Sequence, residues 1–286
     1  MSIDYQGGYN GTVLKVDLDQ GTVFKEPLDA GFARAYIGGR GFTSRLQYDL
    51  IPSKAEPLGP ENVVIFAPGP LTGTSAPSSG RFTLGGRSPL TGLLGDANSG
   101  GFWGAVLKKA GYDLITVHGR STRPVYLWIH DDQVELRDAR HLWGKDTRET
   151  EKLIREQMGR GVSVASIGQA GENQVRFASL MADVEHAAGR TGLGAALGAK
   201  HFKAIAVRGT RGVPIHDEPA FKELSDRLYE ILELDSRSGQ ELPEYGTTAL
   251  LDHHTAIGGV NVRNFQEGIY EDKEKIDGDA LNAQYL

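Results

Sequence analysis

Cysteine is absent from the 286-residue chain, which excludes disulfide bonds and thiolate sites for metals or iron–sulfur clusters within these residues. Basic residues are not in excess. The formal charge of −6 argues against nucleic acid or an anionic membrane as the main partner. No apolar run approaches the roughly 18 residues that span a bilayer, and residues 1–11 lack the features of a secretory signal. We therefore expect a cytoplasmic protein that binds neither nucleic acid nor membrane.

Glycine, by contrast, is abundant: the chain has 38 glycines, nearly twice the average share. They concentrate before residue 212 and lie between segments with clear strand or helix patterns. Segments 12–28 and 124–139 alternate apolar and polar residues and predict β-hairpins, whereas 146–159 has helical spacing. After residue 212 the patterns are helical. This change predicts a domain boundary near residue 212.

Two glycine-rich stretches, 95–119 and 185–209, have the same build and align at an offset of 90. Further upstream, at an offset of 95, the dipeptide Arg176-Phe177 aligns with Arg81-Phe82. Each unit is expected to run through a strand, a glycine loop, an Arg-Phe strand, a glycine turn, a helix and a strand. Such an internal duplication predicts two similar halves packed about a pseudo-two-fold axis.

The two glycine turns each precede a predicted helix. Helix N-termini carry free N–H groups and partial positive charge, so two of them facing one cleft would suit a ligand with two anionic ends. The cationic residues expected near this ligand are Arg81, Arg87, Lys108, Lys109, Arg190 and Lys200. Tight helix-on-sheet packing explains the glycines equally well. The pattern alone leaves both explanations open.

Six longer segments carry a more specific signal. They are APGPLTGTSAPSSGRF (67–82), RSPLTGLLGDANSGGFWGAVLKKAGYD (87–113), LRDARHLWGKDTRETE (136–151), ASIGQAGENQVRFASLMAD (165–183), HAAGRTGLGAALGAKHFKAIAV (186–207) and YGTTALLDHHTAIGGVNVRNFQEG (245–268). In these segments and in their order the chain resembles the tungsten-containing aldehyde ferredoxin oxidoreductase family. The resemblance implies an α+β fold: an internally duplicated, two-sheet N-terminal domain with flanking helices over residues 1–211, followed by the start of an all-α domain over 212–286.

The resemblance also implies a cofactor, in which tungsten or molybdenum lies between two pterin dithiolenes whose phosphates are bridged by magnesium. By matched motif, Asn98 and Ala187 would offer backbone carbonyls to the magnesium, and Gly100 and the amides around Gly189 would approach the phosphates. Arg81 would lie between a pterin and the iron–sulfur cluster. The other residues expected at the cofactor are Ser99, His186, Ala188 and Arg190. Relatives can carry arginine at the position of His186.

The activity implied by the resemblance is oxidation of an aldehyde to a carboxylic acid, with electrons passing through a 4Fe-4S cluster to ferredoxin or an electron-transfer subunit. The family's cysteine cluster motif follows shortly after the segment that matches 280–286, where this sequence stops without a cysteine. A C-terminal helical part or a partner chain is therefore expected to complete the enzyme, and the chain alone is expected to be inactive or incomplete. A homodimer remains open, and no residue is assigned as catalytic acid or base.

Some of these residues also resemble motifs of other protein classes. Segment 97–101 approaches a nucleophile elbow with Ser99 as nucleophile, but its first position is alanine. Segment 189–194 has a glycine order different from that of a dinucleotide fingerprint. The adjacent pair His253-His254 is poorly placed to share a metal on a helix. A non-catalytic module that stores or delivers the pterin cofactor remains an alternative function.

Overall fold

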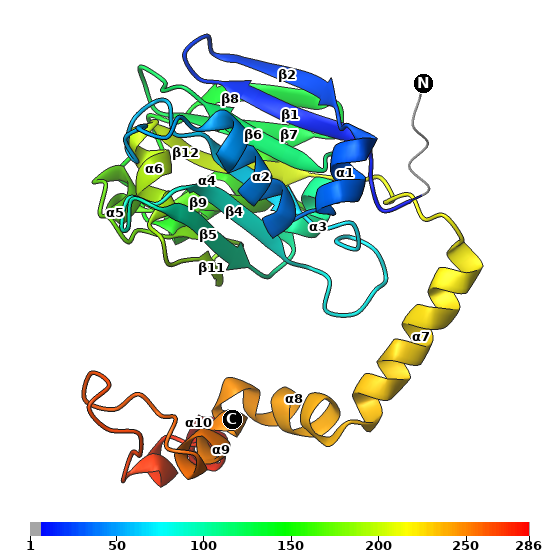
Figure 1. Cartoon of the computed structure of the whole chain (residues 1–286), viewed down its shortest axis with the longest axis vertical. Helices are drawn as coiled ribbons and strands as arrows, with labels where there is room; N and C mark the ends of the chain where they lie inside the picture. Colours follow the sequence, from blue (N-terminus) through cyan, green and yellow to red (C-terminus); the bar gives the residue numbers. More distant parts are fainter. Residues whose placement is uncertain (1–6, 286) are drawn as a thin grey trace. The chain divides into compact units, whose positions relative to one another are not determined.

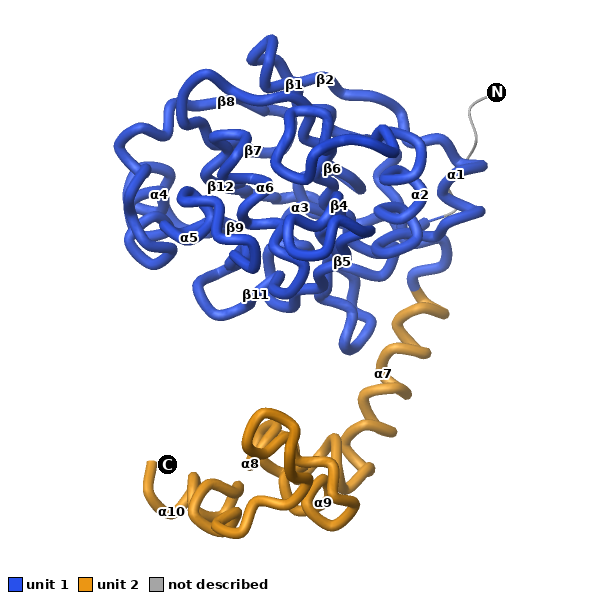
Figure 2. The backbone as a smooth tube through the Cα atoms, turned by 60° about the vertical axis from the view of Figure 1, so that its left-hand side comes forward, with its two compact units in different colours: residues 1–218 blue, residues 219–286 orange. Residues whose placement is uncertain are grey.

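The computed structural model describes residues 7–285. Residues 1–6 and Leu286 lie outside the described residues. The expectation that residues 1–11 form no secretory signal therefore falls partly outside them. Within 7–285, no helix is long and apolar enough to cross a membrane. The chain divides into two compact units, residues 1–218 and 219–286, coloured separately in Figure 2. Each unit is described by itself below.

The first unit contains two six-stranded sheets, most of whose strands are labelled in Figure 1. The first sheet has the order β2-β1-β6-β3-β4-β5. Its strands are β1 (Thr12–Asp17), β2 (Thr22–Pro27), β3 (Val64–Pro68), β4 (Phe82–Arg87), β5 (Leu94–Ser99) and β6 (Leu114–His118). Strands β1 and β6 are parallel, and all other neighbours are antiparallel.

The second sheet repeats the first strand for strand. Its order is β8-β7-β12-β9-β10-β11 when it is followed from the opposite end. The strands are β7 (Val125–His130), β8 (Gln133–Asp138), β9 (Ser163–Ile167), β10 (Leu180–Ala182), β11 (His186–Ala188) and β12 (Phe202–Arg208). Again one pair, β7 and β12, is parallel and the rest are antiparallel. The predicted duplicated, two-sheet α+β fold is confirmed.

Helices cover the sheets in layers. Helices α3 (Trp103–Lys109) and α6 (Leu193–Ala199) contact strands of both sheets, and the main hydrophobic cluster joins the two sheets around them. Helices α1 (Ala30–Tyr36) and α2 (Arg40–Leu50) pack on the outer face of the first sheet, and α4 (Thr147–Met158) packs on the second. A short helix, α5 (Gln169–Glu172), contacts α6.

The sequence explains why the central layer is so tight. Every residue of α6 is buried, and its sequence LGAALGA consists of small residues and leucine, which permit close approach to a sheet on either side. Strands β3 (VIFAP) and β9 (SVASI) are buried at every position, as expected for strands covered on both faces. Across the layer, the Trp103 indole N–H of α3 donates a hydrogen bond to the Ile205 carbonyl of β12 at 3.2 Å.

The second unit is helical in the described residues. It contains most of α7 (Glu218–Leu234), then α8 (Leu242–Tyr245), α9 (Leu251–Ala256) and α10 (Gly278–Tyr285). A π-helical segment spans Ser236–Glu241, and two 3-10 turns span Gly246–Leu250 and Lys273–Lys275. This unit carries the predicted helical patterns of the last part of the chain.

The upstream part of the predicted repeat alignment is wrong. Phe82 begins β4 and is 1% exposed, whereas Phe177 lies ahead of β10 and is 69% exposed. Pro68 and Ile167, the last residues of β3 and β9, pair with Phe82 and Leu180. Leu180 is therefore the counterpart of Phe82. Strand register, rather than the recurrence of a dipeptide, decides this equivalence.

Candidate functional site

The two glycine turns of the repeat lie together in the structure. Strand β5 is the last strand of the first sheet and β11 the last of the second, and these two edge strands contact each other, as Figures 1 and 2 also show. Gly100 and Gly101 follow β5 directly, and Gly189 and Arg190 follow β11. The duplication thus places the same turn of each half at one shared location.

Asn98 and Ala187 occupy equivalent places in the two halves. In the β4–β5 hairpin Phe82 pairs with Ser99 and Thr83 with Asn98. In the β10–β11 hairpin Leu180 pairs with Ala188 and Met181 with Ala187. Since Leu180 is the counterpart of Phe82, Ala187 is the counterpart of Asn98. Both residues are exposed, and both lie on edge strands, whose outer backbone groups have no partner strand in their own sheet.

His186 of the second half lies against the turn of the first. A Cβ atom placed on Gly101, which has a φ of +81°, would collide with the His186 imidazole. A Cβ atom placed on Gly100 would have two neighbouring side-chain atoms within 4 Å, His186 Nδ1 at 3.7 Å and Arg81 Nη1 at 3.9 Å. One imidazole and one guanidinium, each from a different half, therefore flank the backbone of Gly100.

The glycines divide into two groups, one explained by tight helix-on-sheet packing and one that packing does not explain. Gly194 begins the core of α6, and a Cβ there would lie 2.6 Å from the Ser179 carbonyl oxygen. A Cβ on Gly198 would collide with the Gly171 carbonyl, and one on Gly104 would approach the Phe82 Cβ at 3.2 Å. These helix glycines serve packing. Gly100 meets no such obstacle, so close packing does not account for it.

Arg81 is engaged at the edge of the first sheet. Its Nε donates to the Asn98 side-chain oxygen, and the Asn98 amide donates to Thr83 Oγ1 at 3.3 Å. The buried Ser99 Oγ, directly after Asn98, has no hydrogen-bond partner in the described structure. A serine nucleophile needs a base within hydrogen-bond reach. None of the described residues supplies one to Ser99, which argues against the nucleophile-elbow reading.

The turn after β11 has an unusual backbone. Arg190 and Thr191 have φ values of +59° and +49°, in the left-handed region that non-glycine residues seldom adopt, and Gly192 follows at +78°. Arg190 is exposed, whereas Ala188 is buried and Gly189 is partly buried. The Thr191 hydroxyl is buried without a hydrogen-bond partner, although the Thr191 carbonyl accepts from Ser88 Oγ of the first half at 2.6 Å.

Three of the cations expected at the turns, Lys108, Lys200 and Arg87, make their contacts elsewhere. Lys108 forms a buried ion pair with Asp113, and burial lowers its pKa. Lys200 donates to the carbonyls of Gly119 and Pro60 at 2.7 and 3.1 Å, and burial lowers its pKa to about 8. The expectation was wrong for these lysines because they lie at the C-terminal ends of α3 and α6. Cations there complement the helix dipole rather than the helix start.

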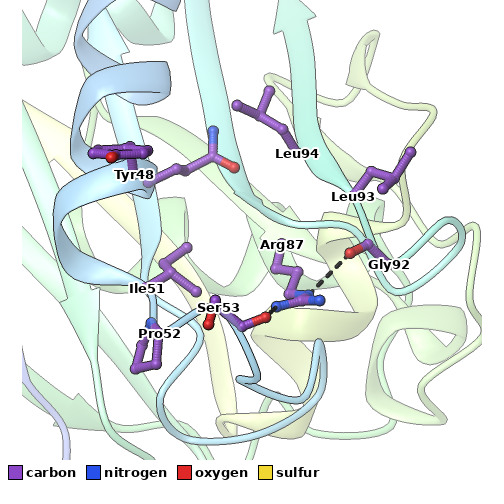
Figure 3. A pocket seen from close by; sticks show the side chains of 9 residues that line it. Tyr48, Ile51, Pro52, Ser53, Arg87, Gly92, Leu93 and Leu94 are labelled. Carbon is purple, nitrogen blue, oxygen red and sulfur yellow. Dashed lines mark hydrogen bonds between the residues drawn. The ribbon is translucent and has the colours of Figure 1, made fainter.

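Arg87 is likewise turned away from the glycine turns. Its Nε donates to the Gly92 carbonyl at 2.9 Å and its Nη1 to the Ser53 carbonyl at 2.6 Å, as Figure 3 shows. It lines a hollow of about 210 Å³ between α2 and the β4–β5 turn, with Tyr48, Leu93 and other residues. Lys109 is exposed at the last position of α3. Of the six predicted cations, Arg81 and Arg190 belong to the segments that flank the turns.

The described residues also limit metal chemistry. Within 7–285, no group of three or more histidine, aspartate or glutamate side chains is arranged to hold a metal ion. His253 and His254 place their ring centroids 5.8 Å apart, edge to face.

Comparisons with known proteins identify the family to which the duplicated domain belongs. Residues 13–209 match the family model described as the N-terminal domain of aldehyde ferredoxin oxidoreductase. The chain belongs to the aldehyde ferredoxin oxidoreductase family. Its family domain thus includes both sheets and ends just after β12.

Two relatives from Pyrococcus species match this chain beyond the family domain. The tungsten-containing aldehyde ferredoxin oxidoreductase of Pyrococcus abyssi is 46% identical over 280 residues, which cover 98% of this chain and 46% of that protein. The WOR-like subunit of the aliphatic sulfonate oxidoreductase of Pyrococcus furiosus is 33% identical over 295 residues, covering 94% of this chain and 45% of that protein. The chain spans about half the length of these relatives.

A solved structure of the same type is the active-site complex BamBC of benzoyl coenzyme A reductase in complex with 1,5-dienoyl-CoA. It matches with a TM-score of 0.79 and 37% identity, covering 83% of this chain and 36% of that chain. This chain is therefore similar to that structure in both sequence and three-dimensional arrangement. The sequence analysis did not identify one residue that lies near the turns, Asp183. Its side chain contacts residues that are distant in the sequence.

Proposed function

We propose that this chain is the N-terminal part, or a subunit, of a cytoplasmic oxidoreductase that binds a tungsten or molybdenum bis-pterin and oxidises aldehydes to carboxylic acids. The supporting observation is the meeting of two equivalent edge-strand turns, one from each half of a duplicated fold. A ligand with two similar anionic ends suits such a pair. Two relatives whose names describe them as tungsten-containing support tungsten as the metal.

The residues at the turns fit this ligand chemically. The backbone carbonyls of Asn98 and Ala187 are proposed magnesium ligands, since magnesium takes oxygen donors and both residues are exposed on edge strands. Gly100 leaves room for a phosphate, because nothing approaches its Cβ position within 3.7 Å. Arg81 and Arg190 supply positive charge. The remaining proposed contacts are Ser99, His186, Ala188 and Gly189.

The role of this chain would be to orient and shield the cofactor. When bound, the metal would supply the two-electron redox chemistry that converts an aldehyde and water to a carboxylic acid. A 4Fe-4S cluster needs cysteine ligands, and the sequence has none. Its ligands, and the path to a ferredoxin-type acceptor, would therefore come from a C-terminal helical part or from a partner chain. We assign no catalytic acid or base.

A second candidate is a non-catalytic module that holds the pterin cofactor for another protein. It is favoured by the absence of cysteine, which leaves these residues without thiolate ligands of their own for a cluster. Both candidates use the same turns. They differ in whether the chain supports aldehyde-dependent reduction of ferredoxin once the missing helical part is supplied.

Metal and pterin analysis tests the proposal directly. The chain would be expressed with tungstate, alone and together with the C-terminal half of the tungsten-containing relative, and assayed for tungsten, for fluorescent oxidised pterin and for aldehyde-dependent ferredoxin reduction. We expect weak retention by the lone chain, because about half of the enclosing protein is missing, and clear retention by the pair. Pterin without activity in the pair would favour the storage module. No pterin in a well-folded pair would overturn both candidates.

Matched glycine variants separate ligand binding from packing. Gly100→Val should lower the retained pterin about tenfold or more with little change in melting temperature, because its Cβ meets only side-chain atoms in ordinary contact. Arg81→Ala should act in the same direction. Gly104→Ala, the packing control, should lower the melting temperature with or without cofactor. Equal losses of stability in Gly100→Val and Gly104→Ala would count against the site.

A further inference from the structure

Asp183 lies in the short turn that joins β10 to β11, immediately ahead of His186 and Ala187. Its hairpin has three residue pairs, from Leu180–Ala188 to Ala182–His186, whereas the β4–β5 hairpin has six residue pairs. Asp183 and Val184 have φ values of +48° and +64°. The left-handed region is costly for a β-branched residue such as valine, so surrounding contacts must hold this turn in place.

The Asp183 carboxylate supplies those contacts. Its Oδ1 accepts hydrogen bonds from Ser163 Oγ at 2.6 Å and from the Val164 amide at 3.2 Å, both at the start of β9. The Asp183 amide donates to the Val164 carbonyl at 2.9 Å. Arg155 Nη2 of α4 lies 3.6 Å from Oδ1. The side chain is only 11% exposed. These contacts anchor the turn within the second half.

The other carboxylate oxygen reaches the first half. Asp183 Oδ2 accepts a hydrogen bond from the Phe102 amide at 3.3 Å, across 81 residues of sequence. Phe102 lies between Gly101 and the first residue of α3. One carboxylate therefore joins β9, the β10–β11 turn and the entry to α3. The counterpart turn of the first half, residues 88–93, is closed by the Ser88 amide, which donates to the Leu93 carbonyl at 2.9 Å, and it reaches the second half through a neutral hydroxyl, Ser88 Oγ, rather than through a carboxylate.

We propose that Asp183 is a positioning residue that fixes the distance between the two glycine turns, and so sets the spacing of the contacts offered to the two ends of the cofactor. This rests on the proposed function. Gly100 and Gly101 lie just before Phe102, and His186 and Ala187 lie just after the Asp183 turn. A second hydrogen bond between the halves runs from Ser88 Oγ to the Thr191 carbonyl at 2.6 Å, so losing the Asp183 link would loosen the Gly101–Phe102 side of the pair while this other link stays in place. Charged acceptors make stronger hydrogen bonds than neutral ones, which suits a link of this kind.

The test uses Asp183→Asn, which keeps the shape but replaces one acceptor oxygen with a donor. The control is Asp113→Asn, which alters another buried carboxylate that accepts two backbone amides, from Asn10 at 2.8 Å and Gly11 at 2.7 Å, and pairs with Lys108. The control should destabilise the fold without touching the turns. Each variant is produced in the full chain, with the C-terminal half of the relative supplied as for the wild type.

Two readouts decide the outcome. Hydrogen exchange of residues 98–106, followed by mass spectrometry, should become about tenfold faster in Asp183→Asn and stay unchanged in Asp113→Asn at equal distance below the melting temperature. Retained tungsten and pterin should fall about tenfold in Asp183→Asn beyond any loss seen in the control. Unchanged exchange at 98–106, or cofactor loss no larger than in the control, would overturn the proposal. A wild-type pair without pterin would overturn the proposed function instead, while the exchange result would still decide whether Asp183 links the turns.

Discussion

The two halves of the first unit share their sheets but not their buried charges. Val117 and Val207 occupy equivalent positions, pairing with the first residues of β3 and β9. Four residues before each of them stand Asp113 and Lys203, which are opposite in charge. Both are buried and both are paired, Asp113 with Lys108 and Lys203 with Glu172. The fold thus accepts either sign at one position, provided that a partner neutralises it.

A second difference concerns how each half holds its edge turn. The first half uses a long β4–β5 hairpin whose Ser88 hydroxyl donates to the Thr191 carbonyl, and the second uses a short hairpin with a strained turn held by the Asp183 carboxylate. Even so, the registers that place Asn98 and Ala187 are equivalent. The comparison teaches that the geometry of the edge strands is common to both halves, whereas the means of holding them differ.

The largest effects should come from breaking the buried charges. Asp113→Ala leaves the Lys108 ammonium, 1% exposed, without its partner, and we expect a loss of about 3–5 kcal/mol in the free energy of unfolding. Glu172→Ala should act similarly on Lys203, which is fully buried. Urea unfolding measures both. If one variant lost less than about 1 kcal/mol, the two positions would not be energetically alike despite their equivalent places.

Helix glycines should show an unequal response in the two halves. Gly194→Ala forces a Cβ to within 2.6 Å of a backbone carbonyl, which cannot move easily, and should cost about 3 kcal/mol. Gly104→Ala meets the Phe82 side chain at 3.2 Å and should cost about 1 kcal/mol. Thermal and urea unfolding of the pair would show the order. An equal cost would mean that the central layer adjusts on both sides.

Lys200 should make stability depend on pH at the alkaline side. Burial lowers its pKa from 10.5 to about 8, so between these values the folded state has released a proton that the unfolded state retains. The free energy of unfolding should therefore rise with pH through this window, by at most about 1.4 kcal/mol per pH unit. Urea unfolding at several pH values should show this rise in wild type and not in Lys200→Met. Lys109→Met, at an exposed position, should behave as wild type. Parallel curves for all three proteins would refute the assignment.

The smallest effect is expected at the strained turn. Val184→Gly removes the cost of a β-branched residue at a φ of +64° but gives the unfolded chain more freedom. The two effects nearly cancel, and we expect a gain in stability within about 1 kcal/mol. A loss larger than this in urea unfolding would show that the Val184 side chain, rather than the Asp183 carboxylate, holds the turn.

Much of the fold could be predicted from the sequence, because its signals are local. Alternation predicted the hairpins over 12–28 and 124–139, and the glycine turns exposed the duplication. The upstream repeat register was wrong because one dipeptide, Arg176-Phe177, was matched without the pairing of the neighbouring strands. That pairing is set by tertiary structure and leaves only a weak trace in a single sequence.

The candidate site was harder to predict than the fold. The place of Asn98 and Ala187 came from a resemblance, and their structural equivalence required the strand registers. Lys108 and Lys200 were misplaced because proximity in sequence to a glycine turn says little when a helix carries the side chain to its far end. Asp183 was missed because its three groups of contacts come from residues 102, 155 and 163–164, which no local pattern connects.

The hydrogen bond from Trp103 of the first repeat to Ile205 of the second has a consequence for whether one repeat can fold without the other. Each central helix packs between the two sheets, so it covers part of the opposite sheet as well as its own. A polypeptide of one repeat would expose the apolar side of its sheet unless a second copy lent a helix in exchange. We therefore expect an ancestral single repeat to have been a dimer in which each copy covered the sheet of the other. Cutting the gene between residues 118 and 125 should yield two fragments that fold only when they are mixed.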